Sequence, residues 1–151
     1  MQKTMFSELT PPPTHIKCLT IRQPWAHLIV TPQDQLPPGT PTKRVENRSK
    51  PTRHRGSLLI HAGLSRDSLG LAPQVAPVTF GAILGVCNLV DCLHVDDMPA
   101  SKYAGLAYAT GPYCLILRDV RRFETPIPYL GQLAMFSVPL DVVRAAMASG
   151  R

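Results

Sequence analysis

The chain has 151 residues, 44% of them hydrophobic and 17% charged, which suits one folded domain without disulfide or metal support and excludes a disordered chain. Its net charge of +6 falls almost entirely in residues 43–55, where six basic residues accompany one acid. Such a cluster favours nucleic acid as a partner over an acidic membrane surface. No apolar run reaches the length of a membrane span, and no apolar signal core is present near residue 1, so a cytoplasmic location is expected.

Taken in chain order, the patterns predict an arm followed by one domain with more strands than helices. Residues 1–14, which end in consecutive prolines, are expected to form a flexible arm before a single domain over residues 15–151. The Pro-rich residues 31–42 are predicted to form an irregular loop inserted in that domain. Periodicity predicts strands at 15–21, 57–62, 81–92, 113–123 and 133–138, and helices at 24–30, 65–71 and 140–148.

These elements indicate the α+β class, because no regular crossover helices separate the strands. Gly85 lies inside an apolar strand, where a glycine is typical of a bend or bulge. A small mixed β-barrel of five to six strands with peripheral helices fits this pattern best.

The first candidate binding residues lie where the first strand runs into the first helix. Arg22 carries a planar fork of donors, Gln23 carries donors and an acceptor, and Trp25 carries a stacking face. Nucleobases are recognised by this combination of stacking and edge hydrogen bonds. The alternative is structural: Trp25 closes one end of the barrel and Arg22 pairs with a carboxylate.

The second group is Lys43, Glu46 and Arg48, in which a single acid interrupts a basic run. Glu46 can hold a neighbouring arginine as its counter-ion, accept hydrogen bonds from a base amino group, or act as a general base near Lys43. The alternative is a solvated face with local ion pairs. In a regular strand Lys43 and Glu46 face opposite sides, so they converge only if Lys43 precedes the strand or a bulge intervenes.

Further candidates follow this segment. Arg53 and Arg55 can each neutralise a phosphate, or simply be solvated in their loop. His61 lies in an apolar strand, where it either faces the cleft as an acid or ligand or is buried and hydrogen-bonded. The four cysteines form no CxxC pair and are expected to be reduced thiols. No metal or cofactor motif is present, so neither is expected.

The residues IRQPWA at 21–26, the KxxExR spacing of Lys43, Glu46 and Arg48, and the GAILG strand resemble the ASCH family of PUA-like domains over residues 16–139. The resemblance implies a small β-barrel whose cleft, lined by the second motif, binds RNA or modified nucleosides. Some family members hydrolyse N4-acetylcytidine and others cleave RNA. In the amide-hydrolysing members a threonine stands three residues after the lysine, where this chain has Glu46, so that chemistry does not carry over unchanged.

The sequence therefore predicts an RNA-binding domain that recognises single-stranded RNA or a modified nucleoside in a basic cleft, with DNA as a further possible ligand. The alternative is a hydrolase, either an amidohydrolase on an acylated nucleoside or a metal-independent ribonuclease, with Lys43 and Glu46 as catalytic residues. A module that binds an acidic peptide is a third option. The predicted ligand-binding residues are Arg22, Gln23, Trp25, Lys43, Glu46, Arg48, Arg53, Arg55 and His61.

Overall fold

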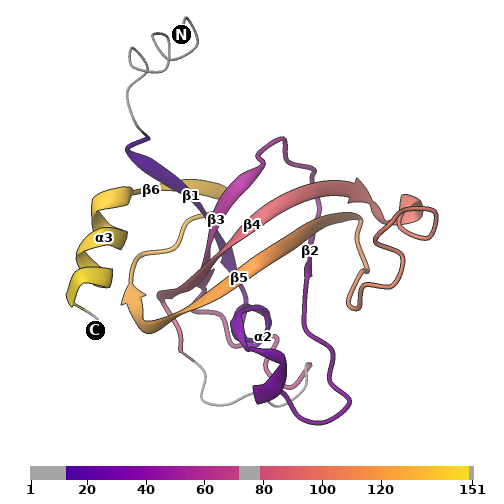
Figure 1. Ribbon diagram of the computed structural model, residues 1–151, viewed down its shortest axis with the longest axis horizontal. Helices are drawn as coiled ribbons and strands as arrows, with labels where there is room; N and C mark the ends of the chain where they lie inside the picture. Colours follow the sequence, from indigo (N-terminus) through magenta and orange to yellow (C-terminus); the bar gives the residue numbers. More distant parts are fainter. Residues whose placement is uncertain (1–12, 72–78, 150–151) are drawn as a thin grey trace, which may run out of the picture.

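The computed structural model describes residues 13–71 and 79–149, so most of the predicted arm at residues 1–14 lies outside the described residues. The described chain forms a strongly twisted mixed sheet with α2 and α3 packed at different places on it (Figure 1). The strands are β1 (His15–Ile21), β2 (Val45–Arg48), β3 (Gly56–Ala62), β4 (Ala82–His94), β5 (Tyr113–Pro128) and β6 (Met135–Pro139). The helices are α2 (Trp25–Val30), α3 (Leu140–Ser149) and the short 3-10 turns η1 (Gln33–Gln35) and η2 (Val95–Asp97).

The strand order in the sheet is β2-β5-β4-β3-β1-β6. The β1–β3 pair is parallel and the other four pairs are antiparallel. The predicted α+β class with five to six strands is therefore confirmed, with six strands in the sheet. The described pairings leave β2 and β6 as the two edges of the sheet, so closure into a barrel stays a prediction.

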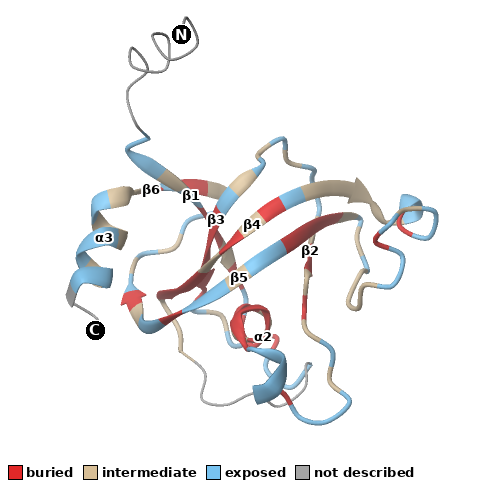
Figure 2. Cartoon of the chain, viewed as in Figure 1, coloured by how far each residue is buried: buried red, intermediate tan, exposed pale blue. Residues whose placement is uncertain are grey.

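The core lies on both faces of the sheet, because the central strand β3 is buried along most of its length (Figure 2). On one face Leu58 and Ile60 pack with Ile29 of α2. On the other face Leu59 packs with Phe136, against which the partly buried side of α3 lies. Burial of both faces explains the continuous apolar runs in the central strands.

Glycine at position 85 permits a close approach of two strands, as the sequence predicts. The pairing of β4 with β5 shifts register between Ile83 and Gly85. A Cβ at position 85 would overlap the carbonyl oxygen of Arg121 on β5. The expected bulge is therefore confirmed, and only glycine allows the backbones to pass this closely.

The helix predicted at residues 65–71 is wrong, because this segment forms turns. Leu64, Leu69 and Leu71 are exposed, so no apolar face is buried to stabilise a helix. Gly70 adopts a φ of +93°, which is left-handed and interrupts helical geometry.

Among the described residues no helix is long and apolar enough to cross a membrane. All four cysteines are free thiols, as the sequence predicts.

Candidate functional site

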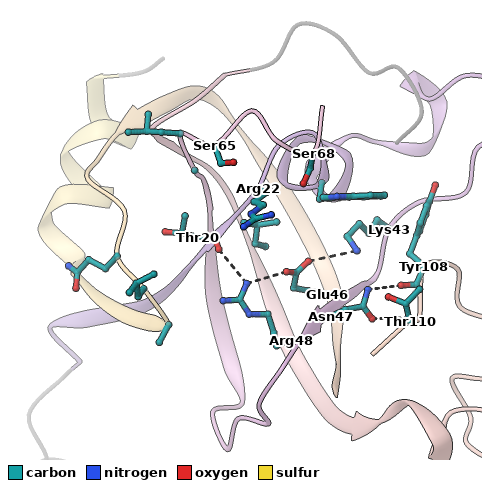
Figure 3. Close-up of a pocket in the computed structure, with 17 residues that line it drawn as sticks. Thr20, Arg22, Lys43, Glu46, Asn47, Arg48, Ser65, Ser68, Tyr108 and Thr110 are labelled. Carbon is teal, nitrogen blue, oxygen red and sulfur yellow. Dashed lines mark hydrogen bonds and ion pairs between the residues drawn. The ribbon is translucent and has the colours of Figure 1, made fainter. Parts of the chain in front are cut away.

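A cavity of about 670 Å³ lies between the end of β1, the start of β2 and the loops that carry Ser65, Tyr108 and Gln132 (Figure 3). It brings together residues from five separate stretches of the chain. The lining residues are Thr20, Ile21, Arg22, Trp25, Lys43, Glu46, Asn47, Arg48, Gly63, Leu64, Ser65, Ser68, Tyr108, Thr110, Gln132, Leu133 and Ala134. Arg22 and Trp25 of the first predicted group and all three residues of the second therefore meet at one site.

Three charged side chains form a row along the floor of this cavity (Figure 3). Glu46 lies in the middle, with its Oε1 3.7 Å from Lys43 Nζ and its Oε2 3.4 Å from Arg48 Nη1. Lys43 also donates a hydrogen bond to the carbonyl of Val45. The strand β2 begins at Val45, so Lys43 precedes it, which is the condition under which Lys43 and Glu46 can converge.

Burial shifts the pKa values of Lys43 and Glu46. Lys43 is 3% exposed and Glu46 7% exposed. Desolvation lowers the pKa of Lys43 and raises the pKa of Glu46, and in each case the neighbouring opposite charge opposes the shift. The pKa values of the two groups therefore move toward each other, which favours proton exchange between them.

An aromatic corner borders the lysine end of the row. The rings of Trp25 and Tyr108 meet edge to face, with centroids 6.0 Å apart. The ammonium of Lys43 lies 5.2 Å from the Trp25 centroid and 5.6 Å from the Tyr108 centroid. These cation–π contacts stabilise the charged amine in a desolvated position. The ring faces turned toward Lys43 are therefore already occupied.

Asn47 and Tyr108 are site residues that the sequence reasoning missed. The Asn47 amide donates to the carbonyl of Tyr108 at 2.8 Å, and its oxygen accepts from the backbone N–H groups of Thr110 and Gly111 at 2.9 and 2.8 Å. Tyr108 has a φ of 68°, a conformation that costs a bulky residue free energy. The only sequence signal that could have identified Asn47 is its position directly after Glu46. No local pattern predicts that Asn47 contacts a loop 61 residues further along the chain.

Of the three candidates in the first motif, Arg22 and Trp25 reach the cavity and Gln23 does not. Arg22 is exposed and lines the cavity, and Trp25 forms its wall. Gln23 is fully buried and is not among the lining residues. Its amide donates to the carbonyl of Thr79 at 2.6 Å and its oxygen accepts from the N–H of His27 at 2.8 Å. Gln23 therefore links the first turn of α2 to the backbone that precedes β4, and its polar atoms are occupied.

Arg53, Arg55 and His61 also lie outside the cavity lining. Arg53 and Arg55 are exposed in the loop before β3, and Arg55 donates to the carbonyls of Thr52 and His54 and lies 3.7 Å from Asp91. His61 is 1% exposed and hydrogen-bonded at both ring nitrogens. The buried alternative for His61 is the one that the structure adopts.

A second cavity, of about 740 Å³, lies between β5 and α3. Apolar side chains such as Phe123, Ile127 and Val143 line it, with Arg121 and Arg122 at one side. It contains none of the predicted site residues. In the described part of the chain no group of three or more metal-ligating side chains is arranged around a common point.

No protein-family model and no curated protein matches the sequence. Among solved structures, the chain is similar to the crystal structure of the ASCH protein of Zymomonas mobilis, with a TM-score of 0.53 and 13% identity over 88% of this chain and 94% of that one. One single-substitution mutant of that protein gives a TM-score of 0.54 with 13% identity over 88% of this chain and 96% of the mutant chain. A second such mutant gives a TM-score of 0.54 with 14% identity over 87% of this chain and 94% of the mutant chain. These similarities cover nearly the whole chain and agree with the resemblance in the sequence motifs. The chain therefore has the fold of ASCH-domain proteins.

Proposed function

We propose that this protein binds single-stranded RNA or a modified nucleoside in the cavity that Trp25, Lys43, Glu46 and Arg48 line. The observation that carries the proposal is charge: three cationic side chains, Arg22, Lys43 and Arg48, face the cavity against one carboxylate. Glu46 compensates one of them, so two cationic groups remain to attract an anionic ligand. A volume of about 670 Å³ lies within the range of small-ligand sites.

The proposed role of each side chain follows from the hydrogen-bonding groups that its contacts within the protein leave available. Arg48 is about one-third exposed and Arg22 is exposed, so both retain donors for a phosphate. Glu46 offers carboxylate lone pairs to the amino group of a base. Trp25 and Tyr108 wall the cavity and hold Lys43 in place.

Arg53 and Arg55 belong to a second contact in this proposal. They lie outside the cavity, in an exposed loop that also contains Lys50. A mononucleotide in the cavity would not reach them, whereas a longer strand would add phosphates along this loop. Each neutralised phosphate releases counterions and steepens the salt dependence of binding.

The test uses Trp25, the only tryptophan of the chain, as a reporter inside the cavity. Ribonucleoside monophosphates and a single-stranded RNA octamer are titrated while tryptophan emission is recorded, with the DNA octamer alongside. Arg48→Gln is expected to weaken binding by about tenfold, since it removes one charge-assisted contact worth about 1.5 kcal/mol. The matched control Arg121→Gln, on β5, leaves binding unchanged. Equal affinity of wild type and Arg48→Gln would contradict the proposal.

The Lys43–Glu46 pair favours a second candidate, a hydrolase that acts on RNA or an acylated nucleoside. The two groups are buried 3.7 Å apart, and their pKa values are shifted toward each other. A buried acid and base whose pKa values approach each other can take up and return a proton during catalysis. Glu46→Gln is expected to abolish turnover of single-stranded RNA or N4-acetylcytidine. Because glutamine keeps a carbonyl acceptor for the amino group of a base, a nucleotide-dependent fluorescence change is expected to remain. If the wild-type protein leaves both substrates unaltered, this candidate fails.

A further inference from the structure

The cavity between β5 and α3 is larger than the one that Trp25 lines, and it has no part in the proposed function. Its walls include Leu59, Phe123 and Ile127, which belong to the core cluster on the sheet face opposite α2. The helix α3 contacts β5 and β6 at one end of the sheet and contributes Val143 to the wall (Figure 1). A volume of about 740 Å³ with mainly apolar walls is typical of a site for a small molecule.

One cationic side chain lies on the same sheet face as these apolar walls. Arg121 pairs directly with Val86 between β5 and β4, and directly paired residues project from the same face of a sheet. Val86 packs against the core cluster that contains Phe123, so the Arg121 side chain lies on the cavity side of β5. Among residues 13–71 and 79–149, no hydrogen bond or ion pair holds the Arg121 guanidinium. Its donors are therefore available to a ligand.

The neighbouring Arg122 is engaged on the other face of the sheet. It pairs with Gly85, where an added Cβ would meet Val30 of α2. Its guanidinium donates a hydrogen bond to Oε1 of Gln35 at 2.6 Å. The lining contains two arginines and, within the described part of the chain, a single acid, Glu124. A net positive charge therefore remains beside the apolar walls.

We propose that this cavity binds an aliphatic carboxylate, such as a medium-chain fatty acid. The chain lies against Phe123, Ile127 and Val143, where its methylene groups are removed from water. The carboxylate accepts hydrogen bonds from Arg121, because the planar guanidinium matches the two carboxylate oxygens. A nucleotide fits less well, since a base is recognised through hydrogen bonds that apolar walls do not supply. This second site does not depend on the proposed function.

The test is calorimetric titration of the full chain with sodium octanoate, decanoate and dodecanoate, each below its micelle concentration. Affinity is expected to rise about fourfold with each added methylene, as for a buried chain. Arg121→Gln is expected to weaken decanoate binding by about tenfold, while affinity for 1-decanol, which has no carboxylate, stays unchanged. Arg122→Gln is the matched control and retains wild-type affinity for decanoate, because its guanidinium is held by Gln35.

A second variant tests where the chain lies. Val143→Phe fills the space at α3 and is expected to abolish binding of both decanoate and 1-decanol, with thermal unfolding as the check that it folds. Equal decanoate affinity of wild type and Arg121→Gln, or affinity independent of chain length, would overturn the inference. Self-association of the wild type that Val143→Phe abolishes would also overturn it, since the cavity would then be an interface between copies of the chain. Arg48→Gln should leave decanoate affinity unchanged, so failure of this site and failure of the RNA site are distinguishable.

Discussion

Replacing Asn47 with alanine tests how the fold builds the cavity wall. Asn47 makes three hydrogen bonds to the backbone of residues 108, 110 and 111, two of them partly buried and one exposed. At about 1 kcal/mol for each bond, less for the exposed one, Asn47→Ala should lower the free energy of unfolding by about 2–3 kcal/mol. For a chain of this length that corresponds to a fall in Tm of about 4–12 °C.

The assay is urea denaturation of wild type, Asn47→Ala and the control Asn88→Ala. Asn88 donates one exposed hydrogen bond to Asp119 at 3.0 Å, so its replacement should cost no more than about 0.5 kcal/mol. Asn47→Ala also frees the loop that holds Tyr108 against Trp25, so nucleotide affinity should fall along with stability. A loss of less than about 1 kcal/mol for Asn47→Ala would refute the view that this amide holds the loop.

Three further predictions address individual side chains. Burial raises the pKa of Glu46 above its ordinary 4.5, so the folded state binds this proton more tightly than the unfolded state does. The free energy of unfolding should therefore fall as pH rises from about 4.5 through the folded-state pKa of Glu46. Glu46→Gln should remove this part of the pH dependence, measured by denaturation at a series of pH values. Arg48→Gln should reduce the slope of log binding constant against log salt concentration for RNA by about 0.7. Replacing Arg53 and Arg55 together should flatten this slope for the octamer and leave it unchanged for a monophosphate. An unchanged octamer slope in that double variant would show that the 50–55 loop does not contact the RNA. Gln23→Ala should cost about 2 kcal/mol of stability by calorimetry, because it breaks two backbone-directed hydrogen bonds, while nucleotide affinity stays within about twofold.

Local spacing in the sequence predicts part of this site well. The spacing of Lys43, Glu46 and Arg48 places three charges near one another in the sequence. Lys43 and Glu46 can lie on the same side because the strand β2 starts at Val45, after Lys43. Five of the six strands follow from apolar periodicity, and the bulge at Gly85 follows from a glycine inside an apolar run, whereas periodicity does not predict β2. These features are encoded within a few residues of each other.

The remainder depends on tertiary contacts that no local pattern carries. Tyr108 enters the site through long-range contacts, in which Asn47 on β2 binds its backbone carbonyl and Trp25 packs against its ring. Gln23 looks like a ligand-binding residue in sequence, yet the backbone at residue 79 takes its amide. The segment at 65–71 has helical spacing, but its leucines find no surface to pack against. In each case long-range packing decides which polar or apolar group is free.

The most direct measurement of the central claim is a crystal structure of the protein with a ribonucleoside monophosphate. The account predicts a phosphate within hydrogen-bonding distance of Arg22 and Arg48, with the polar edge of the base beside Glu46. A nucleotide bound only at the 50–55 loop or in the cavity between β5 and α3, with the Trp25 cavity empty at a saturating concentration, would contradict it.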